Sequence, residues 1–319
     1  TGPEQVKPNF TEVKKQWNNL LQKYLNKDGI LNSEYTIKVN CPHCSSKSKV
    51  DSFELNGFHH HRCEKCSCVF VSPRLNDDAL QDLYTNDYYS EMFSKAMIPF
   101  FEKRKNLIGQ SKYEQVINVL DHVNKERQAP LRILDIGAGI GEVIDVFIDN
   151  GHICKAIEVN KVAVEHLSNR GIEVFADSFF NYDSDKSFDV IMAWGVIEHI
   201  TNPSLFLKKV YSMLNKSGVF VSEVPHSQSL LVEYCKRSKK DPLRILQGEQ
   251  HIILYSKSAY CDIHKKSGLK LHHIQTNGLD MATISDINHL KIDQKIISDI
   301  QDSIDDLLNG DLLRGFWFK

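Results

Sequence analysis

The chain has 319 residues and a formal net charge of −2, with 39 basic against 41 acidic side chains. This balance gives no electrostatic footprint for nucleic acid or for an anionic membrane surface. No apolar run approaches the ~20 residues that a membrane-spanning helix needs, and the first ten residues contain no apolar signal core. We therefore expect a cytoplasmic protein of about two domains, at ~150 residues each, without nucleic-acid or membrane partners.

The first part of the chain predicts a short helical segment and then a metal-binding module. Residues 1–40 form the helical segment, because apolar residues recur at helical spacing from Phe10 to Asn26. Two Cys-x-x-Cys pairs follow, eighteen residues apart, and they predict a zinc ribbon over residues 41–75. Four thiolates close a tetrahedron around one structural Zn²⁺, and the predicted ligands are Cys41, Cys44, Cys63 and Cys66.

Other ligand sets and an unmetallated thiol cluster remain open at this stage. Cys68 is a fifth sulfur that can replace Cys66, and His43 or the run His59–His61 can replace a cysteine. If it binds no metal, the histidine run is expected to lie in a solvated loop. The three remaining cysteines, which are scattered along the chain, are expected to be small buried hydrophobic residues.

Residues 76–129 predict a helical, tyrosine-rich linker or lid. Tyr84, Tyr88 and Tyr89 form an aromatic cluster that is too polar for a core helix. Such a cluster either offers phenol hydroxyls to a ligand or packs between the ribbon and the main domain. One or two helices are expected over residues 98–123, with Arg104 exposed or capping a helix.

The main domain, residues 130–319, begins with the stretch LRILDIGAGIGE at residues 131–142. An apolar strand leads into a turn with glycine at alternate positions, 137, 139 and 141, and a helix starts at once. Glycine lets a backbone turn sharply and approach a ligand, and a helix start offers unpaired N–H groups. The pattern predicts a nucleotide-binding loop.

After this loop strands and helices alternate. Strands are expected at residues 152–159, 172–176, 188–193 and 218–224, and helices at 161–170 and 203–214. Such alternation predicts a parallel sheet with helices on both faces, and ligands of these sheets bind at the carboxyl ends of the strands.

Acidic residues end three successive strands: Asp135, Glu158 and Asp177. Any one of them would fit a solvated cap, but an acid about 20 residues after a glycine loop accepts hydrogen bonds from ribose hydroxyls. The loop lacks the lysine of a phosphate-binding loop and has Glu142 beside it. An acidic loop suits a cationic cofactor without phosphate, and S-adenosylmethionine fits that description.

Four segments, ILDIGAGIGEV, AIEVN, ADSF and FDVIMAWGVIEHITNPSLFLKKVYSMLNKSGVFV, resemble class I S-adenosylmethionine-dependent methyltransferases across residues 131–224. The resemblance implies an α/β, Rossmann-like seven-stranded sheet whose last strand is antiparallel, here separated from the sixth by a helical insertion. It also implies a set of cofactor-binding residues: Asp135, Gly137, Ala138, Gly139, Gly141, Glu158, Val159, Asp177, Ser178, Phe179, Ala193, Trp194 and Gly195.

The order of ribbon, tyrosine-rich segment and this domain is similar to sugar C-methyltransferases that act on nucleotide-linked deoxysugars, and to relatives in polysaccharide and natural-product clusters. In the sugar enzymes a Glu-His pair follows the fifth strand. This chain has Glu249-Gln250-His251 there, so Gln250 replaces the glutamate of the pair.

Methyl transfer is an in-line displacement, so the protein mainly positions the acceptor and handles its proton. Histidine is the natural base near neutral pH, and the candidates are His251 and His199, with Glu249, Tyr88 and Tyr89 as further catalytic candidates. His199 alternatively has a structural role. The sequence predicts methyl transfer to a small polar acceptor such as a nucleotide-linked sugar; the alternative is a catalytically silent relative that binds the cofactor or a partner.

Overall fold

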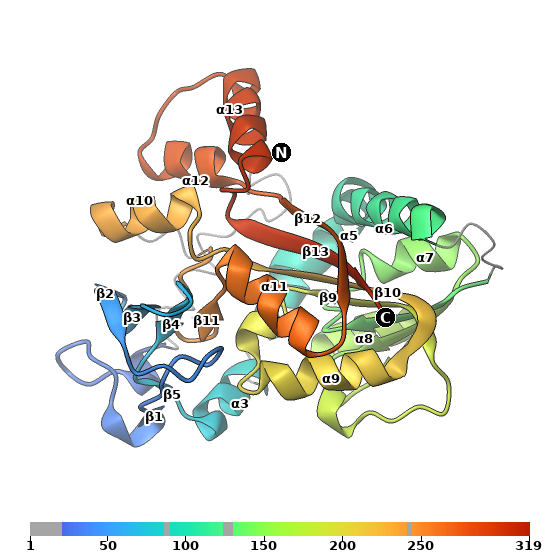
Figure 1. Cartoon of the computed structure of the whole chain (residues 1–319), viewed down its shortest axis with the longest axis horizontal. Helices are drawn as coiled ribbons and strands as arrows, with labels where there is room; N and C mark the ends of the chain where they lie inside the picture. The colour runs from blue at the N-terminus through green and yellow to red at the C-terminus, as the bar shows by residue number, and fades with distance from the viewer. Residues whose placement is uncertain (1–20, 86–89, 124–129, 241–243) are drawn as a thin grey trace.

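The computed structural model describes residues 21–85, 90–123, 130–240 and 244–319. A seven-stranded sheet forms the centre of the molecule, with helices on both faces and a smaller sheet at one end (Figure 1). No helix among these residues is long and apolar enough to cross a membrane. The predicted tyrosines Tyr88 and Tyr89, and most of the predicted first helix, lie outside the described residues.

The large sheet has the strand order β12-β13-β10-β9-β6-β7-β8. The five strands from β10 to β8 are parallel, and β13 runs antiparallel to both of its neighbours. Their bounds are β6 Arg132–Ile136, β7 Ile153–Ile157, β8 Glu173–Phe175, β9 Phe188–Trp194, β10 Leu214–Pro225, β12 Lys270–Thr276 and β13 Leu312–Phe318. The predicted Rossmann-like seven-stranded sheet is confirmed.

Alternation along the strands separates two cores. Ile133 packs into a cluster with α6 and α7, whereas Leu134, the next residue, packs with α9 and α11. Figure 1 shows the two helix pairs on opposite sides of the sheet. The helices of these layers are α6 Gln110–Val123, α7 Ile144–Asp149, α8 Lys161–Asn169, α9 Pro203–Met213 and α11 Lys257–Lys266.

The smaller sheet has the order β11-β4-β3-β2 and is shared between distant parts of the chain. Its strands are β2 Lys49–Leu55, β3 Phe58–Cys63, β4 Val69–Val71 and β11 Ile253–Leu254. A two-stranded pair, β1 Thr36–Ile37 with β5 Arg74–Leu75, and the helix α3 Asp77–Thr85 lie beside it. The small sheet built by residues 41–75 therefore takes its fourth strand, β11, from the second half of the chain.

The expected solvated loop at His59–His61 is wrong. These residues belong to β3, and the side chain of His60 is fully buried and stacked on Phe53, with 5.1 Å between ring centroids. Pairing with β2 and β4 alternates the side chains of β3, so the middle histidine points inward.

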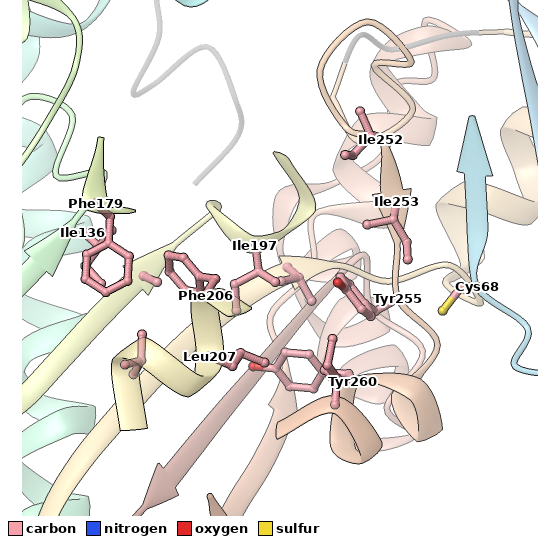
Figure 2. Packing of buried hydrophobic residues seen from close by; sticks show 14 of the residues in the cluster. Cys68, Ile136, Phe179, Ile197, Phe206, Leu207, Ile252, Ile253, Tyr255 and Tyr260 are labelled. Carbon is pink, nitrogen blue, oxygen red and sulfur yellow. The ribbon is translucent and has the colours of Figure 1, made fainter. Parts of the chain in front are cut away.

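One core connects the two sheets. Buried side chains run from Cys68 of the ribbon through Tyr255 and Ile197 to Phe206 of α9, as Figure 2 shows. A continuous apolar core therefore joins the ribbon to the segments around Ile197 and Tyr255.

Helical turns from Met92 to Gly109, which include α5 Phe101–Arg104, lead into α6. The expectation that Arg104 is exposed is wrong, because its side chain is buried and its guanidinium pairs with the Glu142 carboxylate. These turns pack over the glycine loop, where Phe93 and Ile140 share one apolar cluster. Burial of this segment required a partner for Arg104, and Glu142 supplies it.

The predicted helical insertion between the sixth and seventh strands is present as α12 Asp280–Ile287 and α13 Gln294–Asp306. Both helices gather with α10 Leu230–Ser238 at one end of the large sheet (Figure 1). Gln301 of α13 donates a hydrogen bond to the Asp280 carboxylate of α12 over 3.1 Å, which holds the two helices together.

Candidate active site

The glycine loop bends over the end of β7. Gly137, Gly139 and Gly141 have φ angles of +68°, +56° and +83°, in the left-handed region that favours glycine. The N–H groups of Gly137 and Ala138 donate to the Ile157 carbonyl over 2.8 and 3.2 Å. The loop is thus fixed at the carboxyl edge of the sheet, where the ends of β6 and β7 meet.

Asp135 is buried beneath this loop with one oxygen unmet. Its Oδ1 has no hydrogen-bond partner among the described residues. Burial raises the pKa of this carboxyl to about 8, against the opposing charge of Lys112. A buried acid without a local donor fits a cationic ligand group that brings its own N–H donors.

Glu158 follows β7 and turns back onto the loop. Its carboxylate accepts hydrogen bonds from the N–H groups of Gly139, Val159 and Asn160 over 2.8, 2.8 and 2.9 Å. Burial raises the pKa of Glu158, and these N–H groups oppose the rise. The acid predicted for ribose hydroxyls therefore lies directly against the glycine loop.

The residues expected around an adenine ring are more dispersed. Asp177 is exposed and accepts from the Ser178 N–H over 2.6 Å, and Ser178 caps the next turn. Hydrogen bonds from Asn181 and Ser178 lower the pKa of Asp177. Phe179 is buried against Phe206, with 5.0 Å between ring centroids, and belongs to the core, whereas Val159 is 45% exposed.

The segment after β9 reaches the loop from the other side. Ala193 is fully buried, and Gly195 has a φ of +69°. A Cβ placed on Gly137 would come within 2.8 Å of the Val196 side chain, so the two turns are in direct contact. The glycine loop and the residues that follow β9 therefore form one surface.

Two cations lie against Trp194. The ammonium of Lys112 is 4.1 Å from the ring centroid, and the guanidinium of Arg314 is 5.3 Å from it. Both pair with Glu223, over 3.2 Å for Lys112 and 2.8 Å for the Arg314 Nε. Burial opposes ionisation of Glu223, but Arg314 and Lys112 hold its pKa at about 2. Sequence reasoning missed both cations, because α6 and β13 bring them here from opposite ends of the domain.

Glu198, His199 and His251 form an imidazole–carboxylate cluster beside this surface. One ligand atom from each lies within 4.8 Å of the others, and the two imidazole centroids are 4.9 Å apart. Burial, with the nearby His251, lowers the pKa of His199 to about 3, and burial raises the pKa of Glu198 to about 8. The structure thus unites the two predicted histidines and adds Glu198.

The ribbon holds the segment that carries His251. The Ile252 N–H donates to the Glu198 carbonyl over 3.1 Å, and the Ile252 carbonyl accepts from the Val71 N–H over 3.2 Å. A Cβ on Gly248 would come within 2.5 Å of the Phe58 Cβ. Glu249, the further catalytic candidate, is 1% exposed and lies outside the three-residue cluster.

The predicted zinc ligands form a cysteine cluster, which consists of Cys41, Cys44, Cys63 and Cys66. Sγ separations are 3.5 Å for Cys41–Cys66 and Cys44–Cys63, and 3.6 Å for Cys44–Cys66. A tetrahedron of sulfurs at 2.3 Å from a zinc ion has edges of about 3.8 Å, so this donor set fits structural Zn²⁺.

The rival zinc ligands have other partners. His43 faces Asp262, 3.3 Å from its carboxylate, and the His61 Nε2 is 2.8 Å from the Ser72 carbonyl oxygen. Cys68 is fully buried but does not belong to the four-sulfur group.

A surface hollow of about 620 Å³ lies at the opposite edge of the sheet, where Arg132, Ile153 and Phe188 begin their strands. Ligands of open α/β sheets bind at the carboxyl ends of strands, so the chemistry of the glycine-loop edge assigns the candidate site to that edge instead.

Curated relatives resemble a limited part of the chain. The probable (S)-tetrahydroprotoberberine N-methyltransferase 2 of Papaver bracteatum is 32% identical over 104 residues, which cover 30% of this chain and 29% of that protein. The ubiquinone biosynthesis O-methyltransferase of Maricaulis maris (strain MCS10) is 31% identical over 115 residues, 32% of this chain and 45% of that protein. The chain thus spans less than half the length of these relatives.

Among solved structures, the plantazolicin methyltransferase BpumL in complex with SAH is similar, with 15% sequence identity and a TM-score of 0.51. The match covers 76% of this chain and 94% of the BpumL chain. This likeness shows the fold. A family model described as a methyltransferase domain matches residues 108–274, which is more than half of the chain and includes the glycine loop and the Glu198–His199 turn. The chain belongs to the methyltransferase domain family.

Proposed function

We propose that this protein transfers a methyl group from S-adenosylmethionine to a small polar acceptor. The observation that carries the proposal is the direct contact between the turn of Gly137 and that of Val196. This contact places the glycine loop, with the buried acid Asp135 beneath it, next to the turn that leads into the imidazole–carboxylate cluster. A cofactor edge and a proton-accepting group are the two parts that methyl transfer needs.

The predicted cofactor residues fit S-adenosylmethionine. The unmet Oδ1 of Asp135 suits the ammonium of the methionine part, and Glu158 suits the ribose hydroxyls. Trp194 and Gly195 would close the pocket from β9, while Val159 and Asp177 remain accessible for the adenine. The bound cofactor supplies a methyl group already activated on a sulfonium.

His251 is the proposed proton acceptor. Its Nδ1 lies 2.8 Å from the Ile245 carbonyl oxygen, so the neutral ring donates there and has its lone pair on Nε2. His199, kept neutral by burial, lies against it, and we assign it to orienting the acceptor or the His251 ring. Glu249, Tyr88 and Tyr89 remain candidates for binding the acceptor.

A nucleotide-linked sugar is the acceptor that we propose to test first. The order of ribbon, tyrosine-rich segment and Glu249-Gln250-His251 supports it. The cations beside Trp194, Lys112 and Arg314, also support an anionic acceptor, although Lys112 is shared among Glu223, Glu142 and Asp135. We further propose that residues 41–75 are a ribbon closed by structural Zn²⁺ and that residues 76–129 cover the site as a linker or lid.

The test is formation of S-adenosylhomocysteine with a panel of nucleotide-linked deoxysugars and other polar metabolites. His251→Asn is expected to lower kcat by roughly 10²–10⁴, the usual contribution of a general base, and to leave the Kd for S-adenosylhomocysteine unchanged. His272→Asn, at an exposed position on β12, is the control and retains full turnover. Cofactor binding without turnover on any acceptor would overturn the proposal in favour of a binding module.

A further inference from the structure

The imidazole–carboxylate cluster contains more than a proton acceptor requires. Two imidazoles and a carboxylate converge from two segments, the turn after β9 and the loop before β11. The Nε2 of His199 lies 3.9 Å from the Glu198 Oε1, and all three ligand atoms lie within 4.8 Å. A base needs one lone pair, whereas this group gathers three possible metal ligands.

Backbone carbonyls orient both rings. The His199 Nδ1 lies 3.0 Å from the Gln250 oxygen, and the His251 Nδ1 lies 2.8 Å from the Ile245 oxygen. Histidines that ligate a metal through Nε2 commonly donate Nδ1–H to a carbonyl in this way, which fixes the tautomer and the ring orientation. The His251 ring is therefore held in the form that a metal ion accepts. The His199 ring also hydrogen-bonds to the Gly195 backbone, a contact that metal binding would replace.

Glu198 is the second, independent observation. Its side chain is only 3% exposed, and its Oε2 has no hydrogen-bond partner among the described residues. Burial and the charge of Glu223 raise the pKa of Glu198, and its own backbone N–H opposes them. A buried carboxyl with an unmet oxygen is costly, and a bound cation would compensate that cost.

We propose that Glu198, His199 and His251 bind one divalent first-row transition-metal ion, of the class of Mn²⁺, Fe²⁺ or Zn²⁺, that keeps open positions for acceptor oxygens. Imidazole and carboxylate donors in this ratio suit these ions. Ligand bonds of ~2.0–2.2 Å require the three donors to move inward by about 1 Å. Gly195 leaves room for this movement, because even a Cβ there would stay 3.5 Å from the Glu198 Oε1.

Binding of the ion is independent of the proposed methyl transfer, whereas its role rests on that function. In the metal-free chain His251 is the proton acceptor, whereas in the metal-bound chain the ion occupies the imidazole lone pairs and takes over the activation of the acceptor. An acceptor hydroxyl on the ion would then lose its proton to water more easily, since a metal ion lowers the pKa of a bound oxygen acid.

The test is a titration of the full chain, with its cysteine cluster loaded with zinc, by Mn²⁺. Electron paramagnetic resonance and calorimetry measure the binding, and Mn²⁺ is the probe because thiolates select softer ions. We expect about one Mn²⁺ per chain and at least about tenfold weaker binding in Glu198→Gln, because the charged ligand is lost. His251→Asn serves as a second variant if Glu198→Gln fails to fold. Glu249→Gln, an adjacent buried acid outside the cluster, retains wild-type affinity.

Absence of saturable Mn²⁺ binding by the folded wild-type chain would overturn the site. Equal affinity in the wild type and in both cluster variants would overturn it too, because the ion would then bind elsewhere. Turnover measured on the same samples separates the two proposals. Mn²⁺ binding without turnover supports the metal site and counts against methyl transfer. Turnover that is insensitive to chelators, in a chain that binds no Mn²⁺, supports methyl transfer and counts against the metal site.

Discussion

The cysteine cluster and the imidazole–carboxylate cluster collect ligand-type side chains in opposite ways. Four sulfurs, from two short local turns, already stand 3.5–3.6 Å apart in three pairs and would surround an ion completely. The second cluster has three donors within 4.8 Å, and His251 comes from a segment remote from His199 in the sequence. The first arrangement has the four donors of a closed structural site, and the second has only three donors, fewer than such a site needs.

The two clusters are nevertheless connected through the backbone. Strand β4 follows the second cysteine turn and pairs with β11, which begins two residues after His251. The Ser256 hydroxyl also donates to the Cys66 carbonyl over 2.6 Å. The closed cluster therefore fixes the backbone on which the open cluster depends, and the predictions below test this dependence.

The largest effect is expected from Cys63→Ser. Structural zinc contributes apparent binding free energies on the order of 10 kcal/mol to small zinc modules, and loss of one thiolate forfeits much of this. Zinc content should fall below about half an ion per chain, the melting temperature by about 10 °C or more, and turnover should be lost because β11 loosens. Metal analysis, thermal melts and turnover measure the three effects.

Cys261→Ser is the matched control, since this partly buried cysteine lies on α11 outside the cluster. It should keep its zinc. Full turnover by a zinc-free Cys63→Ser protein would show that the open cluster does not need the closed one.

The next prediction contrasts two buried acids that each have an unmet oxygen. Asp135→Asn should weaken S-adenosylhomocysteine binding by roughly 10–100-fold, since a hydrogen bond to a charged group contributes about 1.5–3 kcal/mol. Glu198→Gln should leave that affinity unchanged and weaken Mn²⁺ instead. Calorimetry with S-adenosylhomocysteine and with Mn²⁺ on both variants provides four affinities. Equal losses of affinity for both ligands in both variants would show that the two acids belong to a single site.

Asp135→Asn also has a pH signature. Folding raises the pKa of this carboxyl to about 8, so the ligand-free folded chain holds one proton more than the unfolded chain between about pH 4 and pH 8. Its stability therefore decreases as the pH rises through that window. The neutral asparagine removes this decrease, and the variant should melt several degrees higher than the wild type at pH 8. A lower melting temperature at pH 8 would contradict the assignment.

The sequence predicted the closed cluster and the glycine-loop edge well, because both depend on local spacing. The geometry of two Cys-x-x-Cys turns, and of a strand followed by Gly137 and Gly139, is set by residues that lie close together in the sequence. The open cluster was not predictable as a unit, because β11 must first pair with β4 before His251 can meet Glu198. The burial of His60 and Arg104 was missed for the same reason: their partners, Phe53 and Glu142, are supplied by tertiary contacts.

A smaller effect is expected from Gly248→Ala, which strains the contact between the clusters. The added Cβ would lie 2.5 Å from the Phe58 Cβ, and overpacking of this kind costs about 1–3 kcal/mol. We expect unchanged zinc content, a melting temperature lower by several degrees and turnover reduced several-fold, because His251 shifts with the loop. Reduced stability with full turnover would show that the ribbon supports the fold but not the position of His251.

The smallest effect is expected from Cys68→Ala, which tests whether the closed cluster needs four sulfurs or five. Cys68 is fully buried outside the four-sulfur group, and its thiol hydrogen-bonds with Cys41 and Cys66, so we assign it a supporting role and not that of a ligand. Its removal should cost about 1 kcal/mol, a shift of a few degrees at most, with one zinc retained. Cys66→Ala, which removes a ligand sulfur instead, should release the zinc. Zinc loss from Cys68→Ala but not from Cys66→Ala would exchange the two roles and move one ligand two residues closer to β4.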